Sequence, residues 1–167
     1  MDDFHDPLVR RIAGFLREIG LSVSAGAVAE ATALPGIRIE HGALVVDEAR
    51  MSYPGDLLHE AGHLAVVPAT RRAGFHHDVG NDAGEEIAAI AWSFAAAAHL
   101  GIAPDIVFHA GGYRNASEAI VKSFERPQPP GVPLLAWLGM TVVPRLATPA
   151  GPPPFPHMAH WLCQKES

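Results

Sequence analysis

Residues 55–67 read G-D-L-L-H-E-A-G-H-L-A-V-V, and the predicted architecture depends on them. Within this stretch His59, Glu60 and His63 form the pattern H-E-x-x-H. Two histidines four positions apart on a helix lie on one face, about one turn from each other, so both imidazoles can reach a single cation. Glu60 points roughly 100° away around the helix. There it is poorly placed as a ligand but well placed to take a proton from a metal-bound water.

The residues around this pattern favour a helix. Good helix formers fill it, namely Leu57, Leu58, Ala61, Leu64 and Ala65. Pro54 stands where a proline is tolerated in the first turn, and Pro68 is expected to stop the helix. The sequence therefore predicts a helical metal site, the alternative being two surface histidines on either side of a solvated glutamate.

The composition predicts one globular domain over residues 1–167. A chain of 167 residues with 49% hydrophobic and 18% charged residues is long and apolar enough to bury a core. The net charge of −6 and the absence of a Lys/Arg cluster argue against a nucleic-acid partner. The apolar runs 87–98 and 132–143 are too short to span a bilayer, so we expect no membrane partner.

Cysteine content and the first residues bear on the cellular compartment. Cys163 is the only cysteine, so neither a disulfide within the chain nor a cysteine-based zinc site can form. The N-terminus carries Asp2, Asp3 and Asp6 and lacks the features of a signal peptide. We expect a cytoplasmic protein.

Before the motif, the sequence predicts two helices and a β-hairpin. Asp6 and Pro7 are typical of a helix cap and a first helical residue, and Gly20 is expected to end that helix. An alanine-rich second helix is predicted over residues 24–33. Residues 37–46 form two short apolar runs on either side of a His-Gly turn, which indicates a hairpin.

A loop and a long helix are predicted after the motif. The loop 69–82 contains His76 and His77, which could supply a third metal ligand but do not match the spacing H-E-x-x-H-x-x-G-x-x-H. A substrate-contacting lid or a solvated loop fits this segment better. The helix is expected to begin at Asp82 and to run to about Leu100, before a glycine.

Two glutamates at the start of this helix are candidate ligands. Glu85 stands three residues after Asp82 in the relation of a capping box, which already provides it with a structural role. Glu86 has no such role and heads a segment that is apolar on nearly every face. Its carboxylate is therefore expected to be buried and to need a partner such as a metal ion. We predict Glu86 as the third ligand and keep Glu85 as the alternative.

Residues 101–167 are expected to form a helical and proline-rich region of the same domain, after a metal-site core. Residues 104–110 are compatible with a short helix or a strand. Asn115 and Glu118 indicate a capping box for a further helix, and residues 132–143 indicate another buried helix.

His59, Glu60 and His63, with a glutamate on the next helix, resemble the gluzincin branch of the zincin metallopeptidases. The order hairpin, H-E-x-x-H helix, loop and glutamate-bearing helix resembles most the small zincins of the ImmA/IrrE type, over about residues 37–100. The predicted fold class is α+β. The resemblance implies a mainly helical minimal zincin with a small β-hairpin or sheet packed beside the metal-site helix.

The resemblance also favours one of the two glutamates. In the ImmA/IrrE type the third glutamate is followed by alanine three positions later and by an aromatic residue six positions later. Counted from Glu86 these are Ala89 and Trp92, which fit. Counted from Glu85 the second is an alanine, which fits less well. The family's asparagine after that alanine is replaced here by Ile90.

Together these features predict a zinc-dependent hydrolase, most simply a metallopeptidase that acts on a peptide or protein substrate. Zn²⁺ is the expected cofactor, held by His59, His63 and Glu86, with Glu60 as the general base. A non-catalytic metal-binding regulatory module is the alternative, and an apo structural domain with an accidental motif is a third possibility. The individual substrate and the oligomeric state stay open.

Further residues are expected around such a site. A second group that stabilises the developing oxyanion is commonly needed, and His109, Tyr113 or His157 could supply it. A zinc-bound histidine usually donates its other N–H to a carboxylate or a carbonyl, for which Asp56 and Asp82 are candidates.

Overall fold

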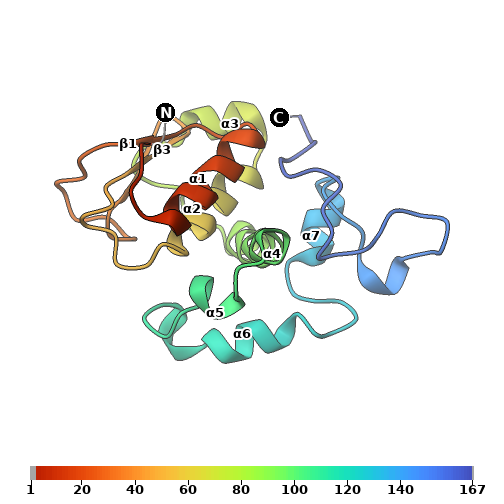
Figure 1. Cartoon of the computed structure of the whole chain (residues 1–167). Helices are drawn as coiled ribbons and strands as arrows, with labels where there is room; N and C mark the ends of the chain where they lie inside the picture. The colour runs from red at the N-terminus through yellow and green to blue at the C-terminus, as the bar shows by residue number, and fades with distance from the viewer. Residues whose placement is uncertain (1–2, 167) are drawn as a thin grey trace.

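Two helices that pack side by side form the centre of the fold: α2 (Asp56–Ala65), which carries the H-E-x-x-H pattern, and α4 (Ala83–Leu100). The computed structural model describes residues 3–166, and Figure 1 looks almost along α4. A β-carbon at Gly62 would lie 2.8 Å from the carbonyl oxygen of Ala89, so no larger residue fits without a shift. The glycine inside the motif therefore lets the two helix backbones touch.

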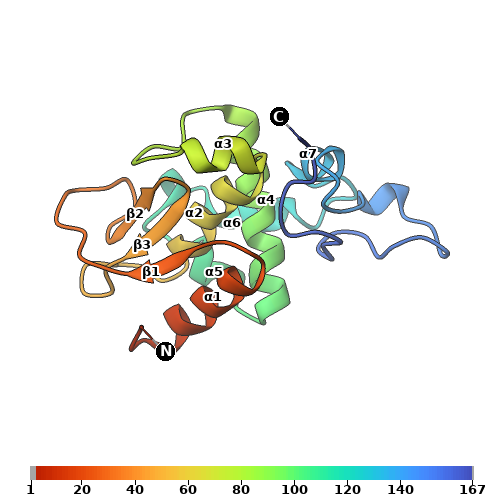
Figure 2. The same cartoon turned by 90° about the horizontal axis from the view of Figure 1, so that it is seen from above.

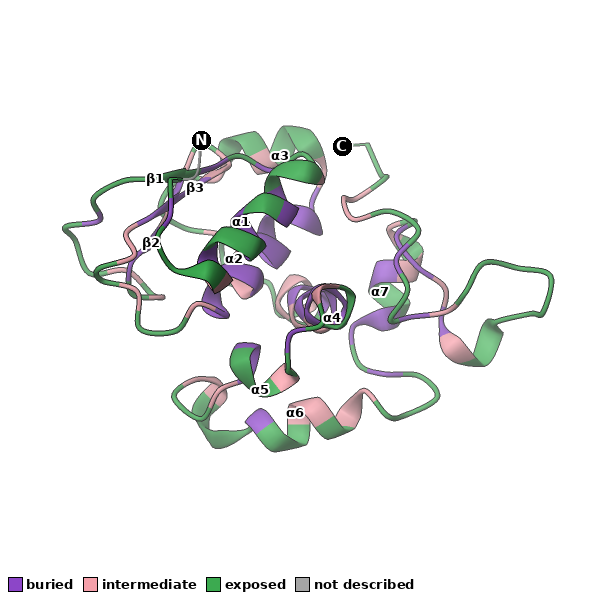
Figure 3. Cartoon of the chain, viewed as in Figure 1, coloured by how far each residue is buried: buried purple, intermediate pink, exposed green. Residues whose placement is uncertain are grey.

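Helix α1 (Pro7–Glu18) forms where Asp6 and Gly20 predict it. The Asp6 carboxylate accepts hydrogen bonds from the backbone N–H groups of Leu8 and Val9, and Gly20 follows the helix with a left-handed φ of 103°. One face of α1 is buried and the opposite face is exposed (Figure 3). The helix therefore covers α2 and strand β1 (Val23–Ala25) with its apolar face.

A three-stranded sheet lies beside α2. Strands β2 (Ile37–Glu40) and β3 (Ala43–Val46) form the predicted antiparallel hairpin, in which Ile39 is paired with Leu44. Strand β1 (Val23–Ala25) runs parallel to β3 on its other side, so the order in the sheet is β1-β3-β2. In Figure 2 the sheet lies on one side of α4, and the last part of the chain, from about residue 132 on, lies on the other.

The predicted helix over residues 24–33 is wrong. Apart from the end of β1, this segment has no regular secondary structure. The N–H of Gly26 donates to the carbonyl of Val46 (3.0 Å), and the N–H of Val28 donates to the Asp47 carboxylate (3.0 Å). The backbone is thus satisfied by β3 and its end, and the helix propensity of the alanines is too weak to compete.

Helix α4 begins and ends as predicted, but the loop before it is shorter. Helix α3 (Ala69–Gly74) occupies the first part of the segment that was predicted to be a loop. The Asp82 carboxylate then caps α4 by accepting the N–H of Glu85 at 2.8 Å. At the other end Gly101 adopts a left-handed φ of 67°, which a glycine tolerates.

The C-terminal region contains short helices separated by longer segments without regular secondary structure. The helices are α5 (Pro104–Val107), the single turn η1 (Tyr113–Asn115), α6 (Ser117–Ser123), α7 (Val132–Trp137) and the single turn η2 (Pro144–Leu146). The predicted capping box of Asn115 and Glu118 is wrong, because Asn115 belongs to η1 and α6 has no side-chain cap. Helix α7 is shorter than the predicted 132–143, since Gly139 soon follows it with a φ of 78°.

An extended C-terminal segment joins α4 to the end of α2. The Trp161 ring packs edge-on against Phe15 and Trp92, at centroid distances of 5.0 Å and 5.7 Å. The Trp92 Nε1–H donates to the Trp161 carbonyl (2.9 Å), and the N–H of Cys163 donates to the carbonyl of Ala65 (2.8 Å). These contacts hold the end of the motif helix in place.

The arrangement confirms an α+β fold that is mainly helical, with a small sheet beside the motif helix. Helix α4 is enclosed by α2, α5 and α7, and its alanine-rich middle is buried. Within residues 3–166, no helix combines the length and the hydropathy that a membrane crossing requires.

Candidate metal centre

Three side chains from the two central helices meet in one place. His59 and His63 project from the same face of α2, and Glu86 projects toward them from the first turn of α4. The two Nε2 atoms lie 3.3 Å apart, and the Glu86 carboxylate oxygens lie 3.4 Å from His59 Nε2 and 2.9 Å from His63 Nε2. The structure thus brings these three predicted residues together.

The group could hold a metal ion, and the separation of its two imidazoles is compatible with zinc. Two ligands held 2.0–2.1 Å from a tetrahedral zinc lie about 3.3–3.4 Å apart, close to the separation of the two imidazole nitrogens. Within residues 3–166 this is the one group of three or more His, Cys, Asp or Glu side chains whose ligand atoms all lie within 4.8 Å of one another. Two imidazoles and one carboxylate can hold zinc and leave a fourth position for water.

Hydrogen bonds within the group stabilise the charged form of Glu86. Hydrogen bonds from His59 and His63 hold the pKa of the Glu86 carboxyl far below its usual range, although partial burial acts in the opposite direction. Burial by itself lowers the pKa of His63, but the hydrogen bond to Glu86 and the charge of Glu60 raise it above its ordinary value. The negative charge of Glu86 is therefore present at neutral pH.

One premise about Glu86 is corrected. The sequence predicted a buried carboxylate at this position, whereas 46% of the Glu86 side chain is exposed. The first turn of α4 projects beyond the core, so the apolar surroundings of the helix begin only after this residue. The two imidazoles, and not desolvation, make Glu86 stand out as a candidate ligand.

Glu85, the alternative ligand, is engaged elsewhere. Its backbone N–H is bonded to the Asp82 cap, and its carboxylate forms an ion pair with Arg71 of α3. Neighbouring residues on a helix point about 100° apart, so Glu85 faces α3 while Glu86 faces α2. Asp82, a candidate partner for a zinc-bound histidine, is likewise used as a helix cap.

Glu60 is partly buried beside the two histidines. Burial raises the pKa of its carboxyl, and the charges of His63 and His59 oppose this shift only in part. Within the described residues no hydrogen bond or ion pair occupies its carboxylate. A carboxylate with a raised pKa and no fixed partner is suited to proton transfer near neutral pH.

His109 and Asp56 bind each other. The Nε2 of His109 lies 2.6 Å from the Asp56 carboxylate, and the imidazole stacks on the Tyr53 ring at a centroid distance of 3.6 Å. Its Nδ1 is buried and has no hydrogen-bond partner. His109 thus fixes the start of α2, and Asp56 is not available to orient His59, whose own Nδ1 is also buried without a partner.

Tyr113 lies next to the candidate centre. Its ring stands edge-on to the His59 ring at a centroid distance of 5.6 Å. Burial, with the negative charges of Asp56 and Glu86, raises the pKa of the Tyr113 hydroxyl above its ordinary value. The hydroxyl therefore keeps its proton at neutral pH and can act as a hydrogen-bond donor.

The remaining histidine candidates lie elsewhere. His76 stacks on His41 of the hairpin turn at a centroid distance of 4.1 Å, and His77 contacts His76. His157 borders a separate hollow with Trp161. None of the three belongs to the group around His59, because the loop and tail that carry them dock on other parts of the core.

A cavity of about 430 Å³ opens beside the candidate centre. Its wall includes Tyr53, Asp56, His59, Glu86, His109, Tyr113 and Arg114. A volume in this range is typical of small-ligand sites. Arg114 was not among the sequence candidates, and its only signal in the sequence is its place after Gly112 and Tyr113 in a turn.

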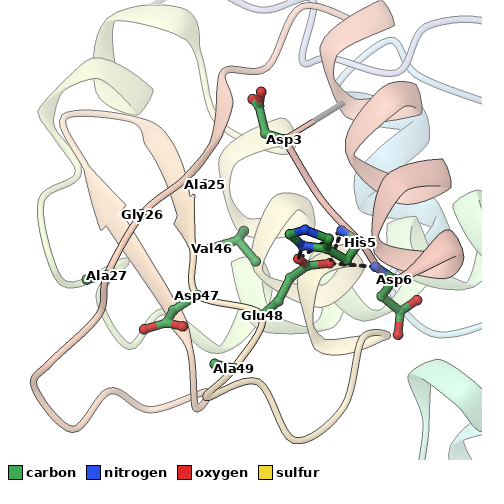
Figure 4. Close-up of a pocket in the computed structure, with 10 residues that line it drawn as sticks. All are labelled: Asp3, His5, Asp6, Ala25, Gly26, Ala27, Val46, Asp47, Glu48 and Ala49. Atoms are coloured by element: carbon green, nitrogen blue, oxygen red, sulfur yellow. Dashed lines mark hydrogen bonds and ion pairs between the residues drawn. The ribbon is translucent and has the colours of Figure 1, made fainter. Parts of the chain in front are cut away.

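A second hollow, of about 580 Å³, lies between the N-terminal segment and the ends of β1 and β3. Figure 4 shows the Glu48 carboxylate turned toward His5 and Asp6. It accepts the backbone N–H of His5 (2.9 Å) and that of Asp6 (2.8 Å), while Asp47 accepts the N–H of Val28. These carboxylates hold the chain together, and none of the predicted site residues lies there.

No protein-family model, curated protein or solved structure matches this chain. The interpretation of the site therefore depends on the geometry of its own residues.

Proposed function

We propose that this protein is a zinc-dependent hydrolase, and that it acts as a metallopeptidase on a peptide or protein substrate. The observation that carries the proposal is the convergence of His59, His63 and Glu86 beside an open cavity, with the two imidazole nitrogens at a separation that suits a tetrahedral zinc ion. An accidental match of the H-E-x-x-H pattern would not require a carboxylate from the next helix to face both imidazoles.

Glu60 acts as the general base in this proposal. A zinc ion held by the three ligands would activate water and polarise the substrate carbonyl. Glu60 accepts a proton from the attacking water and returns it to the leaving amine. The raised pKa of its buried carboxyl and its position between the two histidines on α2 support this role.

Tyr113 is a better candidate than His109 for a donor to the carbonyl oxygen. The Tyr113 hydroxyl stays protonated, and the ring borders the same cavity as His59. His109 is committed to Asp56 through Nε2, and its Nδ1 is buried. We therefore assign the donor role to Tyr113 and the positioning of α2 to His109.

The resemblance to the gluzincin type of zincins supports the same reading. Hairpin, motif helix, connecting segment and glutamate-bearing helix follow one another in the order expected over residues 37–100. In this reading Glu86 is the third ligand, while the ion pair with Arg71 holds Glu85 as part of the helix start.

The decisive test compares Glu60→Gln with the wild type. We expect peptide hydrolysis, measured by mass spectrometry on a mixed peptide library, to fall by about 10²- to 10⁴-fold in the variant, because the base is lost. Zinc content, measured by elemental analysis, should be unchanged, since Glu60 is not a ligand. Glu125→Gln, at an exposed position outside the cavity, serves as the matched control.

The alternatives predict different results. Zinc in the wild type without hydrolysis would favour the non-catalytic metal-binding module. A wild type that purifies without zinc and cannot be loaded with it would contradict the proposal as a whole.

A further inference from the structure

Most arginine side chains in this fold form hydrogen bonds or ion pairs within the chain. All but two of the arginines donate to a carboxylate, a carbonyl or an amide oxygen. Within residues 3–166, only Arg114 and Arg126 have a guanidinium group without a hydrogen bond or an ion pair. An arginine that is free in the folded chain is available to bind an external anion.

The position of Arg114 distinguishes it from Arg126. Arg114 borders the cavity that contains His59 and Glu86, and among the described lysines and arginines no other lines that wall. The two carboxylates of the same wall are already bound, Asp56 to His109 and Glu86 to the histidines of α2. The cavity therefore presents one cation without a partner beside the candidate metal centre.

The backbone around Arg114 is strained. Tyr113, Arg114 and Asn115 have φ values of 56°, 51° and 66°, a left-handed conformation that residues other than glycine rarely adopt. Because the Tyr113 ring stands against His59, this turn keeps Arg114 next to the candidate centre. Strain of this kind is concentrated where a structure positions functional side chains.

We propose that Arg114 binds a carboxylate of the peptide substrate. The planar guanidinium group can form two parallel hydrogen bonds with a carboxylate, which suits an arginine to this anion. The inference rests on the proposed function, because it assumes that the substrate reaches the candidate centre through this cavity. The carboxylate can come from an acidic side chain or from the C-terminus of the peptide, and both have the same chemistry.

Binding of hydroxamate probes tests the proposal without a need for turnover. A hydroxamate anchors to zinc, and a peptide-like tail places one further group in the cavity. Two pairs of tails distinguish the two sources of the carboxylate. Alanine with a free carboxylate is compared with alanine amide to test a C-terminal carboxylate. Glutamate amide is compared with glutamine amide to test a side-chain carboxylate. Dissociation constants are measured by titration calorimetry on the zinc-loaded full-length chain.

We expect one charged tail of these pairs to bind about tenfold more tightly than its neutral counterpart. This gain should disappear in Arg114→Gln and shrink in Arg114→Lys, which keeps the charge but loses the planar fork. Both variants keep a side chain at position 114, so the strained backbone is unchanged. Arg126→Gln removes the other unpaired arginine, outside the cavity, and should leave the gain intact. The pair that shows the gain identifies the source of the carboxylate.

The outcomes separate the two proposals. Zinc and hydroxamate binding in which neither charged tail gains affinity, or in which the gain persists in Arg114→Gln, would overturn the carboxylate site and leave the metal centre standing. Failure of the wild type to bind zinc would overturn the metal centre and the carboxylate site together, whereas zinc binding without binding of any probe would overturn the carboxylate site alone.

Discussion

The carboxylates of Glu86 and Glu48 are each surrounded by nitrogen groups. These groups are mainly backbone N–H groups at Glu48 and imidazoles at Glu86. Glu48 accepts two backbone N–H groups, from His5 and Asp6, in the hollow of Figure 4, and one exposed imidazole, that of His5, lies 3.3 Å from it. Glu86 faces two imidazole nitrogens, those of His59 and His63, which themselves lie 3.3 Å apart. One cluster joins the N-terminal segment to the end of β3, and the other joins α2 to α4.

The difference separates a structural carboxylate from a candidate ligand. A backbone N–H is always a donor, so the Glu48 cluster satisfies itself without any ion. A neutral imidazole carries one donor and one acceptor nitrogen, so the Nε2 atoms that face Glu86 can either donate to it or, in the other tautomer, act with it as acceptors toward a cation. The group between α2 and α4 could therefore hold a cation, whereas the backbone N–H groups at Glu48 could not take part in such a site.

The largest expected effect contrasts the two clusters directly. His63→Ala should weaken zinc binding by about 10²- to 10³-fold, since the roughly 10–16 kcal/mol of a structural zinc site is shared among four ligands. His5→Ala, which removes an exposed imidazole beside Glu48, should leave zinc affinity unchanged. Equilibrium dialysis with elemental analysis measures both. Equal zinc binding in the two variants would show that the centre lies elsewhere.

A smaller effect separates the two neighbouring glutamates of α4. Glu86→Gln should reduce zinc affinity by about 10- to 100-fold, because the amide keeps an oxygen but loses the charge. Glu85→Gln breaks the ion pair with Arg71 and should leave zinc affinity nearly unchanged. The same dialysis experiment compares them, and a larger loss in Glu85→Gln would reverse the assignment of the third ligand.

The smallest effect concerns the structural cluster. Glu48→Gln replaces one acceptor oxygen by an amide that cannot accept the backbone N–H groups of His5 and Asp6 together. The free energy of unfolding should fall by about 1 kcal/mol, a modest value because the side chain is 21% exposed and therefore partly screened. Chemical denaturation measures the change, and zinc affinity serves as the control that should not move.

The effect of Glu48 should depend on pH with a definite sign. Burial alone raises the pKa of Glu48, but the hydrogen bonds from His5 and Asp6 outweigh it and bring the pKa below its ordinary value of 4.5. A carboxyl with a lowered pKa stabilises the fold fully above its unfolded pKa and loses this contribution as the pH falls through the folded value. The difference between wild type and Glu48→Gln should therefore shrink under acidic conditions and persist at neutral pH. A difference that grows with acidity would contradict this account.

Several elements could be predicted from the sequence because they depend on residues close together in the chain. The Asp6 and Asp82 caps, the hairpin around residue 41 and the helical phase of the H-E-x-x-H pattern are of this kind. The segment 24–33 shows the limit of such reasoning. Its alanines favour a helix, but hydrogen bonds to β3, a distant element, determine its conformation.

The sequence also singled out Glu86, but partly for a wrong reason. Burial was expected to force a partner on its carboxylate, whereas the side chain is half exposed. What turns Glu86 toward the histidines is the close approach of α4 to α2 at Gly62 and Ala89. Whether the three side chains bind zinc stays a prediction, for which the experiments above provide the tests.

The spacing within the motif was enough to place the imidazoles of His59 and His63 on one helix face, with Glu60 adjacent to them. This holds because an α-helix has 3.6 residues per turn whatever surrounds it. Packing between distant segments decided the rest: how far α4 is rotated against α2, which carboxylate binds His109, and which arginine is left without a partner at the cavity. No spacing encodes these outcomes, since they depend on how close two helix backbones approach and on where a strained turn directs its side chains.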